Sequence, residues 1–160
     1  MAALLARLLP PLIIGLATGG VAAIGGLITR PEIATWYATL NRPEIAPPNW
    51  VFGPVWTTLY VAMAVAMWLV WRRSIGIVRR AAAAVYGVQL LLNLMWSVVF
   101  FHLHGIGSAL AVIGALLLSI GALLRLFFPI STAAGWLIVP YLIWVSFAAY
   151  LNVNYWILNP

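Results

Sequence analysis

The chain has 160 residues, of which 66% are hydrophobic and only 6% are charged. Soluble domains carry about a quarter charged residues, so this composition excludes an ordinary soluble protein and requires a surface that faces lipid. Cysteine is absent, which excludes disulfides, thiolate nucleophiles and cysteine metal sites. The net charge of +6 comes from arginines near the expected helix ends, so we interpret it as a membrane-orientation signal and not as a nucleic-acid patch.

The number of membrane crossings follows from the length. A helix needs about 20 apolar residues to cross the hydrocarbon core of a bilayer, so this chain allows five crossings with short loops. We predict an all-α integral membrane bundle of five transmembrane helices, a single domain over residues 1–160, with a short lid helix in the first loop. The expected spans are 4–28, 50–71, 81–103, 106–127 and 132–157, and the lid loop is 29–49.

The first apolar segment has two interpretations. A cleaved signal peptide would have a short apolar region, but this stretch continues well past that length, so we interpret it as a membrane span. Gly15 and Gly19 form a GxxxG pair, a spacing that allows another helix to approach closely.

The first loop combines helix signals with prolines. Thr29-Arg-Pro-Glu32 has the pattern of a capping box, which predicts that a new helix begins there. The apolar residues that follow repeat at the spacing of one helix face: Ile33, Trp36, Tyr37 and Leu40. Three prolines then favour an extended return to the membrane, and Asn49 is expected to be the N-cap of the second span.

Arginines are distributed unevenly between the two sides of the predicted bundle. One side has only Arg30 and Arg42, whereas the other collects Arg7, Arg125 and a short basic loop with Arg72, Arg73, Arg79 and Arg80. By the positive-inside rule, the N-terminus and the 72–80 loop face the cytoplasm if the chain resides in a bacterial cell membrane, which we favour. The long first loop and the C-terminus then lie outside.

The inventory of reactive side chains is short. The only carboxylates are Glu32 and Glu44, both in the first loop, so the spans lack the proton-relay carboxylate of a proton-coupled transporter. Carboxylate pairs, Ser-His-Asp sets and phosphate-binding glycine loops are absent as well, which disfavours a hydrolase. His102 and His104 would point about 200° apart on a helix and could not share a metal ion unless the helix ends there, so we interpret them as interfacial.

Nine tryptophans dominate the remaining chemistry. Interfacial belts account for Trp68, Trp71, Trp136 and Trp156. Trp56, Trp96 and Trp144 instead fall inside their spans, and Asn93 lies one helical turn from Trp96. An amide in hydrocarbon needs a partner, so Asn93 must face the bundle interior. Considered alone, Asn93 fits an interhelical hydrogen bond equally well. With three interior tryptophans, it favours a pocket for a flat, largely apolar ligand.

Three motifs carry a resemblance to a known family. The first loop contains Trp36-Tyr37, Leu40-Asn-Arg-Pro43 and Pro47-Pro48-Asn-Trp50-Val-Phe-Gly-Pro-Val-Trp56-Thr. The third span contains Gln89 and Asn93-Leu-Met-Trp96-Ser-Val-Val-Phe100-Phe101, and the fifth contains Pro140-Tyr-Leu-Ile-Trp144, Ala148 and Leu151-Asn152. These motifs cover nearly the whole chain. In order and spacing they resemble the TspO / translocator protein family (TspO/MBR), also called the peripheral-type benzodiazepine receptor.

The resemblance implies a five-helix bundle, usually a homodimer, whose first loop folds over a pocket. Members of this family bind porphyrins such as protoporphyrin IX, sterols and benzodiazepine-type ligands. Some bacterial members are reported to promote light-dependent porphyrin breakdown that depends on pocket tryptophans, which Trp56 and Trp144 match here. Further pocket-lining positions match Tyr37, Pro47, Trp50, Tyr60, Trp96, Phe100 and Ala148. Ser97 stands where some members carry a ligand-binding amide, and Asn93 is a candidate replacement.

The resemblance therefore leads us to expect a tryptophan-rich sensory or translocator-type protein that binds tetrapyrroles and other flat apolar ligands inside the bundle. The expected partners are the lipid bilayer, a haem-like tetrapyrrole or sterol-like ligand and a second copy of the chain, with no required cofactor, no metal and no nucleic acid. The alternatives are a light-dependent porphyrin-degrading enzyme, which would use Trp56 and Trp144, and a porphyrin or sterol transporter. Eukaryotic relatives lie in the mitochondrial outer membrane. Specific cholesterol recognition is disfavoured, because no basic residue follows Val153 and Tyr155.

Overall fold

The computed structural model describes the backbone of residues 2–160 and the side chains from residue 8 onward. The elements are, in order, α1 (Ala2–Ala34), α2 (Trp36–Thr39), the 3-10 turn η1 (Asn49–Val51), α3 (Phe52–Arg73), α4 (Gly76–Ser97), the π-helical segment η2 (Val98–His102), α5 (Ile106–Ile130) and α6 (Thr132–Leu158). Five helices are long and apolar enough to span a membrane. The described part of the chain contains no strand. The predicted all-α bundle of five spans with a short lid helix is therefore confirmed, and the chain is a multi-pass membrane protein.

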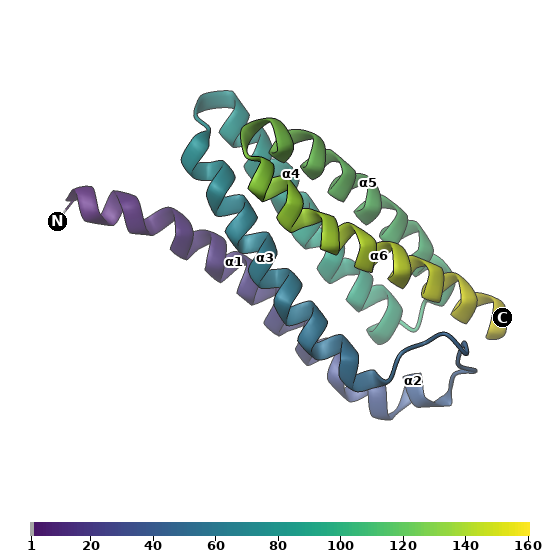
Figure 1. The fold of residues 1–160 in the computed structure, drawn as a ribbon. Coiled ribbons are helices and arrows are strands. Elements are labelled where there is room, and N and C mark those ends of the chain that lie inside the picture. The colour runs from purple at the N-terminus through teal and green to yellow at the C-terminus, as the bar shows by residue number, and fades with distance from the viewer. Residues whose placement is uncertain (1) are drawn as a thin grey trace.

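The long helices form one bundle, in which α1 lies at the periphery (Figure 1). α3 packs against α1 and α6, α5 packs against α4 and α6, and α4 also contacts α1. The order around the bundle is thus α1, α3, α6, α5, α4. Figure 1 shows the N-terminal part of α1 projecting away from the other helices, while α2 and the C-terminal end of α6 lie at the same end of the bundle.

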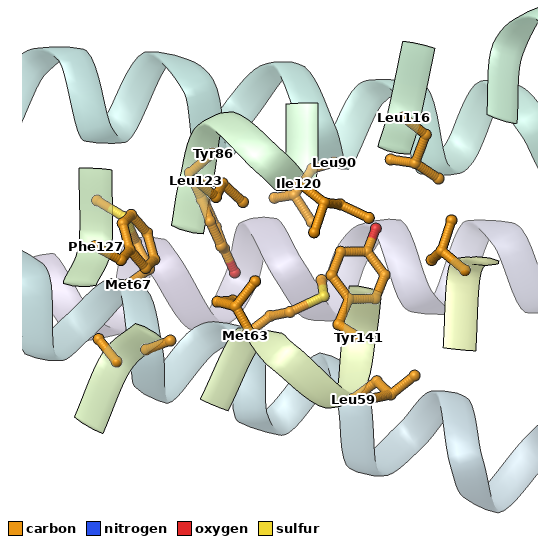
Figure 2. Packing of buried hydrophobic residues seen from close by; sticks show 14 of the residues in the cluster. Leu59, Met63, Met67, Tyr86, Leu90, Leu116, Ile120, Leu123, Phe127 and Tyr141 are labelled. Carbon is orange, nitrogen blue, oxygen red and sulfur yellow. The ribbon is translucent and has the colours of Figure 1, made fainter. Parts of the chain in front are cut away.

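Buried apolar side chains from α3, α4, α5 and α6 fill the centre of the bundle. Figure 2 shows side chains such as Met63, Ile120 and Tyr141 meeting between these helices, where each of the three has 0% exposure. Other large apolar residues point outward, among them Leu16 and Leu118, which are 75% and 79% exposed. Water disfavours an apolar surface of this extent, whereas lipid tails accept it.

The end of the first helix differs from the prediction. α1 runs without interruption to Ala34, so residues 29–32 lie within it and form no capping box. A capping box needs free amides, and the amides of a continuing helix are already bonded to the preceding turn. Pro31 removes only one donor and does not end the helix. The loop therefore begins at Thr35, and the lid helix is only the four residues of α2.

Two further boundaries were predicted wrongly. Asn49 is the first residue of η1 and not an N-cap, and no side-chain cap bond forms at the start of η1 or α3. The third span begins at Gly76 and not at residue 81, because Gly76 has a φ of 57° and lets the chain reverse within two residues. Arg79 and Arg80 consequently lie within the first two turns of α4 and not in a loop.

The arginine-rich end of the bundle lies where α3 ends and α4 begins. The Arg72 guanidinium lies 5.7 Å from the ring centre of Trp68, and the Arg79 guanidinium lies 4.9 Å from that of Trp71. Arginine over an indole face is a cation–π contact, and both side-chain types are favoured at a membrane surface. This end of the bundle therefore has the features of a headgroup contact region.

Candidate functional site

A cavity of about 560 Å³ lies between α1, α3, α6 and the end of α4, beneath the loop that joins α1 to α3. Ten of its 25 lining residues are aromatic, and Arg30 is the only charged one among them. The aromatic residues are Tyr37, Trp50, Phe52, Trp56, Tyr60, Trp96, Phe100, Phe101, Trp144 and Tyr155. Pockets for small molecules usually measure about 300–1,000 Å³ and are mostly apolar, and this cavity has both properties.

The wall formed by α1 consists of small residues. Gly19, Ala22 and Gly26 recur every three or four positions, so they share one helix face, and the backbone itself lines the cavity. A Cβ atom added at Gly19 or Gly26 would meet no heavy atom within 4 Å. The glycines therefore leave open space next to the facing aromatic walls.

The wall opposite α1 is aromatic. On α3, Trp56 and Tyr60 lie one turn apart with ring centres separated by 5.6 Å. On α6, Trp144 contacts Phe52 edge to face at 5.8 Å. The Nε1 atom of Trp144 is buried and has no hydrogen-bond partner among the described residues. The described part of the protein therefore leaves this indole N–H unsatisfied.

At the end of α4, hydrogen bonds fix the orientation of a third tryptophan. Trp96 Nε1 donates to Asn152 Oδ1 at 3.0 Å, and Asn152 Nδ2 donates to the Ile106 carbonyl at 2.9 Å. The Trp96 ring stacks on Phe100, with centres 5.3 Å apart and planes 27° apart. Phe100 belongs to η2, and the wider π-helical turn carries it to a position that is only 2% exposed.

The roof of the cavity is the loop over residues 35–48, and α6 holds it in place. The Tyr155 hydroxyl donates to the Tyr37 hydroxyl at 2.6 Å. The Asn41 amide N–H donates to Asn159 Oδ1 at 2.8 Å, and Asn159 Nδ2 donates back to the Asn41 carbonyl at 3.1 Å. Within the loop, Arg42 donates to the carbonyls of Ala46 and Pro47, which stabilises the proline-rich turn.

Burial raises the pKa of Tyr37 well above its ordinary value. Burial favours the neutral phenol, because the phenolate would lose its hydration. Tyr37 therefore stays protonated across the physiological pH range. Its hydroxyl accepts the Tyr155 proton and keeps its own proton for another acceptor.

A second contact joins the roof to the link between η2 and α5. Glu32 Oε2 lies 3.1 Å from His104 Nε2, and the Trp36 ring stacks on the His104 ring at 4.2 Å with planes 13° apart. His104 has a φ of 54° and lies beyond the end of η2. Among residues whose side chains are described, no three His, Cys, Asp or Glu residues approach closely enough to hold a metal. His104 thus has a structural contact with the roof.

A chain of hydrogen bonds leads from the cavity wall into the core. Tyr60 OH donates to Asn93 Oδ1 at 2.6 Å, Asn93 Nδ2 donates to Tyr141 OH at 3.0 Å, and Tyr141 OH donates to Gln89 Oε1 at 3.0 Å. Asn93 is 3% exposed, so it faces the bundle interior as expected. These hydrogen bonds satisfy the hydroxyl and amide groups of Tyr60, Asn93 and Tyr141, which would otherwise be costly to bury, whereas Gln89 Nε2 is buried without a partner among the described residues.

Nine of the eleven predicted site residues surround this one cavity: Tyr37, Trp50, Trp56, Tyr60, Trp96, Ser97, Phe100, Trp144 and Ala148. The other two lie outside the lining. Asn93 lies behind Tyr60 and forms the interhelical hydrogen bonds that were the alternative interpretation of this residue. Pro47 belongs to the roof, where its carbonyl accepts from Arg42.

Sequence reasoning missed several lining residues. Arg30 and the glycine wall belong to α1, and Tyr155 and Asn152 belong to the last turns of α6. The glycine spacing was visible, but we interpreted it as a helix contact surface. Within this chain, added Cβ atoms at Gly15 and Gly19 would touch nothing within 4 Å. The spacing of Gly15 and Gly19 therefore belongs to a face of α1 that no other part of the described chain packs against.

Comparisons with known proteins agree with this architecture. The TspO/MBR family model matches residues 13–157. A tryptophan-rich sensory protein from Cereibacter sphaeroides is 39% identical over 145 residues, which cover 90% of this chain and 88% of that protein. Protein CrtK from Rhodobacter capsulatus is 36% identical over 140 residues, which cover 84% of each chain. The human translocator protein is 36% identical over 135 residues, which cover 83% of this chain and 80% of that protein. With a family match over most of its length and relatives of this similarity, the chain belongs to the TspO/MBR family.

Proposed function

We propose that this chain is a membrane protein that binds tetrapyrroles such as protoporphyrin IX, and other flat apolar molecules, in the cavity beneath the loop over residues 35–48. The observation that carries the proposal is the concentration of ten aromatic residues around one cavity of about 560 Å³. Aromatic faces pair with a planar macrocycle by offset stacking, and each good pair contributes about 0.5–1.5 kcal/mol beyond buried area.

The preformed state of the cavity supports the same function. Hydrogen bonds within the chain, between Tyr37 and Tyr155 and between Asn41 and Asn159, tie the roof to the C-terminal end of α6. Trp96 is held by Asn152 in the same way. Groups that are ordered before binding do not lose conformational entropy on binding, so more of the contact energy becomes affinity.

Titration of the purified protein with protoporphyrin IX tests the proposal, with the porphyrin Soret absorbance as readout. We expect saturable binding by the unaltered protein. The Trp56→Ala, Trp144→Ala double variant removes two stacking partners and should lose about 1–3 kcal/mol, which raises Kd about 5- to 150-fold.

The matched control is the Trp136→Ala, Trp156→Ala double variant. Both residues belong to α6, lie outside the cavity lining and are 63% and 51% exposed. This variant should bind as the unaltered protein does. Equal affinity in the Trp56/Trp144 variant and the unaltered protein would contradict the assigned site.

We further propose that the arginine-rich end faces the cytoplasm and that the roof faces outward. The positive-inside rule supports this orientation, since Arg72, Arg73, Arg79 and Arg80 gather at one end of α3 and α4. The chain lacks cysteine, so a single cysteine introduced at Glu44 or at Ile77 reports which side of the membrane that position faces. A membrane-impermeant thiol reagent added outside intact cells should label position 44 only. Labelling of position 77 alone would reverse the orientation.

A homodimer also belongs to the proposal. Among the residues whose side chains are described, none from another helix covers the apolar α1 face that carries Leu12 and Leu16, which are 59% and 75% exposed. Light scattering of the detergent-solubilised protein should give the protein mass of two chains. A single-chain mass across the accessible concentration range would contradict this part.

A further inference from the structure

Arg30 is the only charged residue that lines the cavity, and nothing in the described chain neutralises it. It lies four residues before the end of α1, on the side of the roof, and its side chain is exposed. No hydrogen bond or ion pair joins it to the residues whose side chains are described. A guanidinium without a partner at the mouth of an apolar cavity is free to bind an anion from outside.

The charged residues closest in sequence are occupied elsewhere or lack any contact to Arg30. Glu32 lies two positions further along α1, so it points to a different side of the helix, where it contacts His104 at 3.1 Å. Arg42 donates to the carbonyls of Ala46 and Pro47 and thereby holds the loop. Arg42 therefore has a structural role, whereas Arg30 has none within the described chain.

Other polar groups of the lining also have hydrogens to donate. The Tyr37 hydroxyl accepts from Tyr155, so its own proton remains available, and burial keeps this phenol neutral by raising its pKa. The Trp144 indole N–H is buried without an acceptor. Tyr60 is the opposite case, because its proton is already donated to Asn93. Among these groups, Arg30 alone is charged and exposed at the mouth of the cavity.

We infer that Arg30 binds an acidic group of the ligand, a carboxylate carried on an otherwise apolar ring system, and so sets the orientation in which the ligand enters. This inference rests on the proposed function. With the acid at Arg30, the ring system extends inward between Trp56 and Trp144. The carboxylate stays at the exposed mouth and keeps part of its hydration, so the ion pair forms without the large desolvation cost of a buried charge.

The test compares two probes with the same macrocycle: protoporphyrin IX, which carries two propionates, and its dimethyl ester, in which both acids are esterified and uncharged. Both are titrated into the unaltered protein and into Arg30→Gln in a non-ionic detergent, which supplies no phosphate. Because an exposed but charge-assisted pair is modest in strength, Arg30→Gln should weaken binding of the diacid about three- to ten-fold. Binding of the diester should stay within about two-fold of the unaltered protein.

The matched control is Arg80→Gln, which removes the same charge from the exposed start of α4 at the opposite end of the bundle. This variant should leave the affinity for both probes unchanged. That result would exclude an effect of the net charge of the protein. Added salt should reduce the preference of the unaltered protein for the diacid and change little in Arg30→Gln.

Two outcomes overturn the inference. Equal loss for the diacid and the diester would mean that Arg30 supports the cavity and does not recognise an acid. An unchanged diacid affinity, with loss of co-purified anionic phospholipid from Arg30→Gln, would mean that Arg30 binds a lipid headgroup. The proposed function fails separately, if neither probe binds the unaltered protein.

Discussion

The hydrogen bonds of Asn93 give a prediction that can be worked out in energy. Asn93→Leu keeps a similar volume but removes the 2.6 Å bond from Tyr60 and the 3.0 Å bond to Tyr141. Tyr141 retains Gln89 as its acceptor, so the Tyr60 hydroxyl is the group left without a partner. Interhelical hydrogen bonds in membranes average ~0.6 kcal/mol and reach ~1.7 kcal/mol. Two of them predict a loss of about 1–3 kcal/mol of unfolding free energy.

Reversible unfolding of the protein in mixed micelles with increasing SDS measures this loss. A double-mutant cycle with Tyr60→Phe isolates the shared bond, and the coupling energy should be about 0.6–1.7 kcal/mol. Tyr150→Phe is the control, because Tyr150 is 53% exposed and its hydroxyl forms no hydrogen bond with the described residues. Additive effects of Asn93→Leu and Tyr60→Phe would refute the reasoning.

Three further predictions concern the α1 wall and the roof. Gly26→Leu places a side chain in open cavity space and should weaken protoporphyrin IX binding about ten-fold, whereas Gly20→Leu, outside the lining, should not. Asn159→Ala removes the pairing with Asn41 and should speed hydrogen exchange of the Asn41 amide about five-fold, for a loss of about 1 kcal/mol. Because folding raises the pKa of Tyr37, its contribution to stability is intact below about pH 10 and declines above it, and Tyr37→Phe should reduce that alkaline decline.

Each of these predictions has a contradicting result. Equal binding loss in the two glycine variants would show a general effect of leucine on α1. Unchanged amide exchange in Asn159→Ala would show that the roof is held by other contacts. An unaltered alkaline decline in Tyr37→Phe would assign that decline to other groups.

The five spans could be predicted because the signal is local and strong. Apolar runs of helix length with arginines at their ends leave few alternatives, and the expected starts at residues 106 and 132 coincide with those of α5 and α6. The interior position of Trp56, Trp96 and Trp144 could be predicted for the same reason. Helical spacing together with the cost of burying an amide indicated that Asn93 faces the bundle interior.

The boundaries around the first loop could not be predicted from local signals. Thr29-Arg-Pro-Glu32 has capping chemistry, but the contacts of α1 with α3 and η2 keep the helix continuous to Ala34. The Asn41–Asn159 pair joins residues 118 positions apart, and no local pattern indicates such a partner. Long-range pairing of this kind depends on where the helix ends meet in space.

Asn93 also shows where helical spacing reaches its limit. Its position one turn from Trp96 correctly predicted the interior, but spacing does not separate a cavity wall from the layer behind it. Tyr60 occupies the lining position, and Asn93 holds its hydroxyl from behind. The contribution of Asn93 to the cavity is therefore to position Tyr60.

A structure of the protein determined with protoporphyrin IX bound tests the central claim most directly. The account predicts the macrocycle beneath the loop over residues 35–48, with its ring between Trp56 and Trp144 and a propionate at Arg30. A porphyrin found on the outer surface of the bundle, with the cavity unchanged, would contradict it.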